Sequence, residues 1–307
     1  MNSISTLVRE EGGRIRAFWR ILIPISLALT IVYGAQWLGL VVGLGIFLEL
    51  GGMVLAIIVV LWVGSRWIDN RPIKEYGLDI NKKWWTDLIS GFIIGTFVVG
   101  IAWSLNIALG WSTLTSTLSG AVGPFAIIFP MILVFLILTS VWEEIVFRGT
   151  FIVNATEGFT KSGISSFYSV VLALTTSTFV FAIYHFLVHL VPVLVLTKPP
   201  GVPISVMLLV FAVGGVTFGI AYIFTGSLAA PIGLHTAYNL MRFVVFGDTA
   251  PPLDDLPALL RFEMDFPGLW EATRGFEYPM YFVGIFAIIL WVYLTRGEIS
   301  LDKSLVK

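Results

Sequence analysis

The sequence predicts an all-α membrane protein, a polytopic transmembrane helical bundle of about eight spans, and two observations carry this prediction. Hydrophobic residues make up 57% of the 307 positions and charged residues only 12%, well below the roughly 25% charged content of soluble domains. The mean hydropathy is +0.94. The apolar residues also form runs near the roughly 20 residues that a helix needs to cross the hydrocarbon core.

The apolar runs follow one another with few interruptions. Only glycines at positions 39, 43 and 45 separate the first two runs, so an odd number of spans remains open. We find no internal repeat and no linker long enough to divide the chain, and we expect a single transmembrane domain over residues 1–307. The eight predicted spans lie at about residues 17–39, 43–65, 86–110, 124–148, 165–190, 204–224, 228–246 and 279–295.

Lysine and arginine are distributed unequally between the two sides of the predicted bundle. With eight spans, the side that holds both termini carries thirteen of these residues, whereas the opposite loops carry Lys198, Arg261 and Arg274. The largest opposite loop, 247–277, also contains seven acidic residues. Because cytoplasmic loops collect Lys and Arg, we expect a multi-pass protein of the cell membrane, plasma or inner, with both termini cytoplasmic.

Three short patterns place charged and polar side chains inside apolar runs: Glu143-Glu144-x-x-x-Arg148, Phe181-x-x-x-His185 and His235-x-x-x-Asn239. A charged side chain at the centre of a transmembrane helix costs about 2.5–3.5 kcal/mol on insertion scales. A membrane protein that keeps several such residues usually uses them. The patterns therefore indicate a functional site inside the membrane.

The first pattern contains one paired and one unpaired carboxylate. Residues four apart share a face of a helix, so Glu144 faces Arg148 and the two charges can neutralise each other. Glu143 points elsewhere and has no cation near it in the sequence. Such a carboxylate suits general base catalysis. The alternative is that both glutamates belong to a structural ion network that joins helices.

The two histidine patterns also place polar groups on one helical face. His185 lies one turn beyond Phe181, and His235 shares a face with Asn239. A histidine four residues before an asparagine can present two N–H donors to one developing oxyanion. A single buried histidine is more often a structural bridge between helices, but two histidines in different spans beside an unpaired glutamate favour a site.

The expected depths of these residues do not agree in a model of straight helices. Counted from the cytoplasmic turn near Lys161 at about 1.5 Å per residue, His185 would lie farther from the cytoplasmic side than Glu143. It would also lie much farther from that side than His235. We expect a tilt, a kink or an interfacial start of the fifth span to restore a common depth.

These residues resemble the motifs of the CPBP intramembrane endopeptidases, the family that contains type II CAAX prenyl proteases and bacteriocin-processing Abi-like proteins. The resemblance covers a motif-bearing core at about residues 124–245. The matching segments are Glu143-Glu144-Ile145-Val146-Phe147-Arg148-Gly149, Ser177 through His185, and Thr225-Gly226-Ser227-Leu228 followed by His235 and Asn239.

The resemblance implies a helical intramembrane protease. In such an enzyme the residue matching Glu143, assisted by His185, activates a water molecule for attack on a peptide carbonyl. The positions matching His235 and Asn239 would hold the oxyanion. Supporting roles are implied for Glu144, Arg148 and Phe181.

We expect no cofactor and no metal, although zinc held by Glu143, His185 and His235 remains an alternative. The expected partners are the lipid bilayer and a peptide or protein substrate, prenylated or otherwise membrane-associated, as in CAAX processing; no nucleic acid is expected. The competing function is a catalytically silent immunity or scaffold protein. A transporter is less favoured, because the sequence shows no repeated pair of broken helices.

Overall fold

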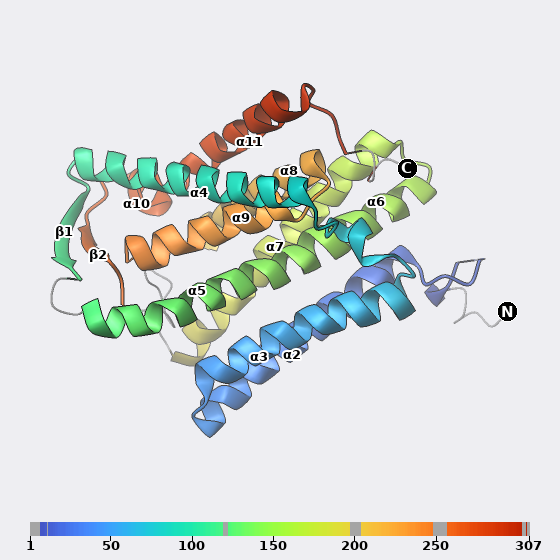
Figure 1. The fold of residues 1–307 in the computed structure, drawn as a ribbon, viewed down its shortest axis with the longest axis horizontal. Coiled ribbons are helices and arrows are strands. Elements are labelled where there is room, and N and C mark those ends of the chain that lie inside the picture. Colours follow the sequence, from blue (N-terminus) through green and yellow to red (C-terminus); the bar gives the residue numbers. More distant parts are fainter. Residues whose placement is uncertain are drawn as a thin grey trace.

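The computed structural model describes residues 7–10, 12–118, 122–196, 204–247, 257–302 and 305 of the chain, and long helices make up most of it (Figure 1). The segments η1, η3 and η4 are π-helices that continue the preceding α-helices, and η2 is a 3₁₀ turn. The helical elements in chain order are α2 (Ala17–Val42), α3 (Gly45–Val59), η1 (Val60–Ile68), η2 (Ile73–Tyr76), α4 (Lys82–Ala108), α5 (Val122–Glu144), η3 (Ile145–Thr150), α6 (Phe151–Lys161), α7 (Ser166–Leu196), α8 (Ile204–Thr225), α9 (Ala229–Asn239), η4 (Leu240–Val245), α10 (Leu269–Thr273) and α11 (Met280–Arg296). The strands are β1 (Ser112–Thr117) and β2 (Leu260–Met264).

The predicted class, an all-α polytopic membrane protein, is confirmed. Each of the eight predicted runs is helical, and 6 helices within the described residues are long and apolar enough to cross a membrane. The remaining two, 229–245 and Met280–Arg296, are shorter, so the count of eight spans stays a prediction. The six long helices are Ala17–Val42, Gly45–Ile68, Lys82–Ala108, Phe125–Lys161, Ser166–Val188 and Leu208–Thr225.

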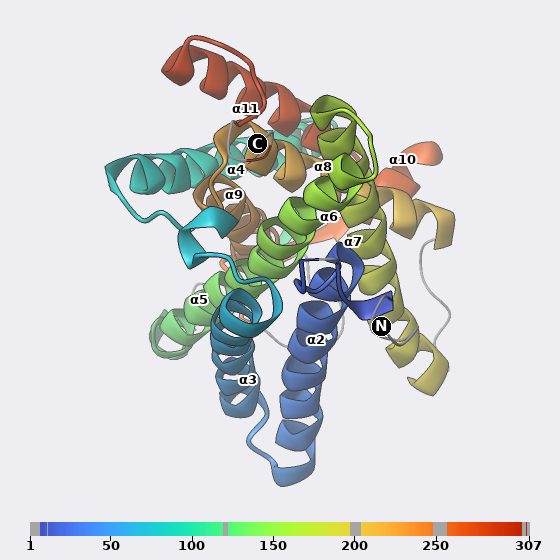
Figure 2. The same cartoon turned by 90° about the vertical axis from the view of Figure 1, so that its right-hand side faces the viewer.

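A glycine makes the break between the first two helices, which the sequence marks only weakly. Gly43 adopts a φ of 72°, a left-handed conformation, and its N–H donates to the carbonyl of Gly39. This conformation is readily accessible to glycine and ends a helix. The chain therefore turns back at this point, and α2 and α3 form an antiparallel hairpin (Figure 2).

Small residues let α4 and α9 approach closely. A Cβ atom added to Gly95 of α4 would lie 2.9 Å from the carbonyl oxygen of Leu234 on α9. One added to Gly233 of α9 would collide with the carbonyl oxygen of Leu88. Interfaces of this small-residue kind are common between transmembrane helices. Helix α4 therefore supports α9, which carries the third polar pattern.

The strands form a ribbon at one end of the bundle. They pair antiparallel, with Ser112 opposite Met264 and Thr117 opposite Leu260. This ribbon was not predicted from the sequence, because its strands come from distant parts of the chain. The N-terminal segment from residue 7 and the last turn of α11 lie at the opposite end (Figure 1). Their common end agrees with an even number of spans, whereas the side of the membrane that it faces stays a prediction.

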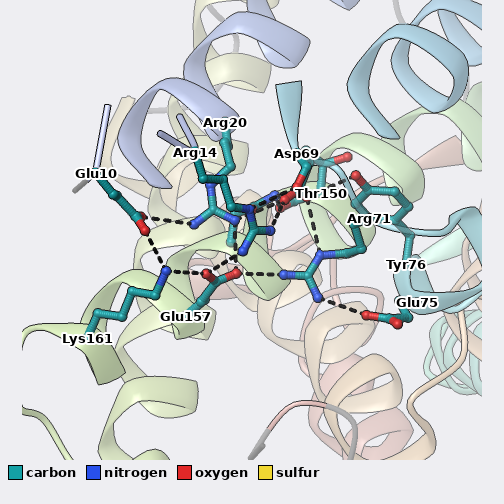
Figure 3. A network of polar contacts seen from close by, with 11 residues as sticks. Glu10, Arg14, Arg20, Asp69, Arg71, Glu75, Tyr76, Thr150, Glu157 and Lys161 are labelled. Atoms are coloured by element: carbon teal, nitrogen blue, oxygen red, sulfur yellow. Dashed lines mark hydrogen bonds and ion pairs between the residues drawn. The ribbon is translucent and has the colours of Figure 1, made fainter. Parts of the chain in front are cut away.

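An ion-pair network at that common end joins α2, the connection from α3 to α4, and α6 (Figure 3). Asp69 lies at its centre, with Oδ1 2.6 Å from Arg14 Nη2 and 2.9 Å from Arg20 Nη1. Its Oδ2 accepts hydrogen bonds from Asn154 Nδ2 at 2.8 Å and from Tyr76 OH at 2.9 Å. The residues that complete the network include Glu10, Arg71, Glu75, Glu157 and Lys161.

The negative charge of Asp69 stabilises the fold only above an acidic pH. Burial acts to raise the pKa of its carboxyl, but attraction by Arg71 and hydrogen bonds from Arg20 and Asn154 outweigh burial, so the pKa lies below its ordinary value. A carboxyl whose folded pKa lies below its unfolded value stabilises the fold above the unfolded pKa, about 3.9 for aspartate. This contribution is lost as the pH falls from about 4 through the folded pKa.

We predict that Asp69→Asn lowers the stability of the detergent-solubilised protein by about 3–5 kcal/mol at neutral pH, because the arginines lose a buried counter-charge. The matched control is Asp79→Asn, which alters an exposed aspartate. Thermal unfolding from pH 7 to pH 3 measures both variants. The gap between wild type and Asp69→Asn should narrow below about pH 4, and a gap that widens there would contradict this account.

Candidate active site

The two glutamates of the first pattern lie at the junction of α5 and η3 and have different partners. Glu144 is fully buried, and its Oε1 lies 3.0 Å from Nη1 of Arg148, which is also buried. Arg148 Nη2 donates to the carbonyl of Gly215 on α8 at 3.2 Å. The structure therefore contains the Glu144–Arg148 pair that the spacing predicts, and the pair reaches a second helix.

Glu143 points away from that pair and toward two histidines. The residue is buried, with 4% of its surface exposed. Glu143 Oε2 lies 3.6 Å from Nε2 of His185 on α7 and 3.9 Å from Nε2 of His235 on α9. Within the described part of the chain, this oxygen accepts no hydrogen bond. The structure thus brings residues from three separate patterns to one buried point.

The hydrogen bonds of the two rings define where their protons lie. His185 Nδ1 is 3.0 Å from the carbonyl oxygen of Phe181, and His235 Nδ1 is 2.9 Å from Glu144 Oε1. A carbonyl and an ionised carboxylate can only accept, so both Nδ1 atoms donate. In each neutral ring the Nε2 atom then carries a lone pair, and both lone pairs are on the Glu143 side.

Aromatic rings fix the orientation of these polar groups. The ring of Phe181 lies 4.1 Å from the ring of His185, and the Arg148 guanidinium stands 4.2 Å from the centre of the same phenyl ring. Phe218 of α8 stacks on His235 at 4.5 Å with an interplanar angle of 13°. Phe181 thus contacts both a histidine and the arginine of the ion pair, a cation–π contact that gains strength where water is excluded.

Asn239 lies one turn beyond His235 at the end of α9, where η4 begins. Its side chain is half-buried, and it makes no hydrogen bond with the residues that the structure describes. The structure therefore brings Glu143, His185 and His235 into mutual proximity, whereas Asn239 is adjacent through the shared helical face and not through a direct contact.

The position of the turn between α8 and α9 contributes to the common depth of these residues, and this cause was not among those expected. The turn between α8 and α9 lies farther into the bundle than the turn after α6. Leu228 of the first turn donates its N–H to the carbonyl of Gly77 at 2.9 Å, next to Gly149. A Cβ at Gly149 would be 3.1 Å from a Leu228 methyl group. Gly149 lies 12 residues before Lys161, or about 18 Å along a helix. The recessed α8–α9 turn brings His235 level with Glu143.

Two side chains near the site were not predicted from the sequence. Tyr184 OH donates to Glu143 Oε1 at 3.4 Å, and it directly precedes His185 in the second motif. Tyr33 of α2 lies 2.7 Å from the Tyr184 hydroxyl, oxygen to oxygen. Tyr184 could have been considered from its place in the motif, but no sequence signal marks Tyr33.

The described residues contain no group of three or more His, Cys, Asp or Glu side chains placed to hold a metal ion. The ring orientations nevertheless also suit zinc ligands, because metal-bound histidines usually donate their other ring N–H to a carboxylate or carbonyl. Zinc content and the effect of chelation on cleavage therefore test the alternative in which Glu143, His185 and His235 bind zinc.

The fold and the site together define a multi-pass helical membrane protein with a buried carboxylate–histidine centre. Residues 124–241 match the family model described as type II CAAX prenyl endopeptidase Rce1-like. This segment contains all three patterns and is a domain of that family, which confirms the resemblance found in the sequence. No curated protein and no solved structure matches the chain. The family match indicates a CAAX-type intramembrane protease that acts on a protein substrate.

We predict that Glu144→Gln and Arg148→Leu each lower the free energy of unfolding by about 3–5 kcal/mol, because either change strands a buried charge. Glu143→Gln serves as the matched control and should change stability much less, since among the described residues Glu143 lies against histidines and Tyr184 and not against an arginine or lysine. Thermal unfolding in detergent measures all three. Equal losses of stability would contradict this division between the glutamates.

Proposed function

We propose that the chain is an intramembrane endopeptidase in which Glu143 and His185 activate a water molecule for attack on a peptide bond near the membrane. The observation that carries this proposal is the approach of Glu143 Oε2 to His185 Nε2 at 3.6 Å. An ionised carboxylate and a lone-pair nitrogen are both acceptors and cannot bond to each other. A water molecule has two donor hydrogens and can satisfy both.

Such a water would be polarised toward attack. Glu143 Oε2 accepts one of its protons, and the hydrogen bond to His185 orients its lone pair toward the substrate carbonyl. General base catalysis of this kind typically contributes about 10²–10⁴-fold to rate. The proton taken by Glu143 is then available for the leaving amine. Residues 1–307 would form one transmembrane domain around this centre.

The oxyanion of the tetrahedral intermediate would be held by His235 and Asn239. Because His235 Nδ1 donates to Glu144, its Nε2 becomes a donor only when the ring carries both protons. Glu144 at 2.9 Å and Glu143 at 3.9 Å are the counter-charges for that imidazolium. Asn239 would supply a neutral N–H from the next turn. Glu144 and Arg148 support this arrangement by fixing the His235 ring.

The proposed substrate is a peptide or protein of the CAAX type, prenylated or otherwise membrane-associated. Exposed apolar side chains cover the outer faces of the surrounding helices, so we expect a lipidated or membrane-inserted chain to approach the polar centre from within the bilayer. The family match supports this class of substrate.

We predict that the purified protein cleaves one class from a panel of prenylated CAAX peptides, unprenylated CAAX peptides and leader peptides. Glu143→Gln should lower the rate by about 10²–10⁴-fold while leaving thermal stability and membrane insertion intact. The measurement is peptide product formed in detergent or liposomes. The control, Glu298→Gln, changes an exposed glutamate near the C-terminus and should be neutral.

Two outcomes separate the proposal from its competitors. Cleavage that survives in Glu143→Gln would show that another residue is the base. A well-folded wild type that cleaves no peptide of the panel would favour the silent immunity or scaffold protein.

We predict that exhaustive chelation leaves cleavage unchanged, and that Asn239→Ala lowers turnover by about 10²–10³-fold, as removal of one oxyanion donor does elsewhere. Zinc content per chain and activity are measured on the same samples. Zinc supplies hydroxide by lowering the pKa of its bound water to about 7. Activity that tracks about one zinc per chain would replace the glutamate–histidine mechanism with a zinc mechanism.

A further inference from the structure

The oxygen of Glu143 that faces away from the histidines is held by a pair of tyrosines. Tyr184 OH of α7 donates to Glu143 Oε1 at 3.4 Å, and the Tyr184 and Tyr33 hydroxyl oxygens are 2.7 Å apart. Tyr33 belongs to α2, which lies outside the matched segment 124–241. A helix outside the family domain therefore contacts the proposed base through one intermediate.

The direction of the hydrogen bonds follows from the donors available. An ionised carboxylate can only accept, so Tyr184 uses its one hydroxyl proton toward Glu143. The proton in the bond between the two tyrosines must then come from Tyr33. A hydroxyl that accepts a hydrogen bond is polarised into a better donor, so Tyr33 strengthens the long contact between Tyr184 and Glu143.

Ring packing fixes the position of the Tyr184 hydroxyl. The Tyr184 ring lies 5.3 Å from the ring of Phe147 in η3 and 5.9 Å from that of Trp142 in α5, and the residue is 9% exposed. Trp142 is the neighbour of Glu143 in sequence. The hydroxyl and the carboxylate are thus held by the same local packing.

The other charged groups near Glu143 do not bond to its Oε1 within the described residues. Among the described residues, the titratable or charged side chains near Glu143 come from four segments. They are Glu144 and Arg148 from α5 and η3, Tyr184 and His185 from α7, His235 from α9 and, through Tyr184, Tyr33 from α2. Glu144 and Arg148 bond to each other, and the two histidines face Oε2. Within the described residues, Tyr184 is the donor to Oε1.

We propose that Tyr184 and Tyr33 are positioning residues, which hold the Glu143 carboxylate by Oε1 so that Oε2 stays directed at the water that it shares with His185. The inference rests on the proposed function of Glu143 as the base. Helix α2 is then required for full activity, because its Tyr33 acts on Glu143 through Tyr184.

The kinetic test uses the full chain and the peptide that the wild type cleaves. Tyr184→Phe should lower kcat by about 3–10-fold with KM unchanged, as loss of one hydrogen bond to the base implies. Tyr33→Phe should lower kcat by about 2–3-fold and have no further effect in the Tyr184→Phe background. The matched control, Tyr168→Phe, alters a tyrosine of α7 that is 64% exposed and should leave kcat unchanged.

A second measurement does not depend on turnover. Infrared spectroscopy follows the carboxyl band of Glu143, which is assigned by its loss in Glu143→Gln. Tyr184→Phe should shift this band, Tyr33→Phe should shift it less, and Tyr168→Phe should not. If Glu143→Gln retains activity, the proposed function fails, and the band still decides whether the tyrosines hold the carboxylate.

Two results would overturn the proposal. An unshifted band with unchanged kcat in Tyr184→Phe would show that the tyrosines do not hold Glu143. A loss of activity that appears as a higher KM or a lower melting temperature, with additive effects of the two substitutions, would show a merely structural role.

Discussion

The buried ion pair between Glu144 and Arg148 is the interaction on which the site depends. Moving a charge from water into a low-dielectric interior carries a penalty of several kcal/mol per ion, which is offset only by close partners. Glu144 Oε1 meets Arg148 Nη1 at 3.0 Å and His235 Nδ1 at 2.9 Å. One carboxylate oxygen therefore joins the α5–η3 segment to α9, and Arg148 extends the link to α8 through Gly215.

Glu144 binds both Arg148 and the His235 N–H. Glu143 therefore lies against His185 and the Tyr184 hydroxyl instead of a guanidinium. Two adjacent carboxylates thus have different surroundings, which is the usual way in which one site separates a structural charge from a reactive one. The backbone supplies the rest of the arrangement. Close contacts at Gly95 and Gly233 hold α9 against α4, and the recessed α8–α9 turn sets the depth of His235.

The sequence predicted the class of fold and the contact within the first pattern, because both depend on local rules, whereas the meeting of the three patterns was expected only from the family resemblance. Apolar run length predicts helices, and i, i+4 spacing predicts the contact between Glu144 and Arg148. Contacts between distant segments leave no such signal. The recessed turn depends on a hydrogen bond from Leu228 to Gly77, and the contact of Tyr33 with Tyr184 on packing between α2 and α7. Neither can be read from periodicity.

In the proposed mechanism, Glu143 Oε2 and the two histidines bind the atoms that change during hydrolysis. An experimental structure with a peptide analogue that carries a gem-diol, two hydroxyls on one tetrahedral carbon, in place of the scissile carbonyl shows which side chains bind these two oxygens. We expect one analogue oxygen within hydrogen-bonding distance of Glu143 Oε2 and His185 Nε2, and the other within reach of His235 Nε2 and Asn239. An analogue bound away from Glu143, or a metal ion between its hydroxyls and the histidines, would contradict the account.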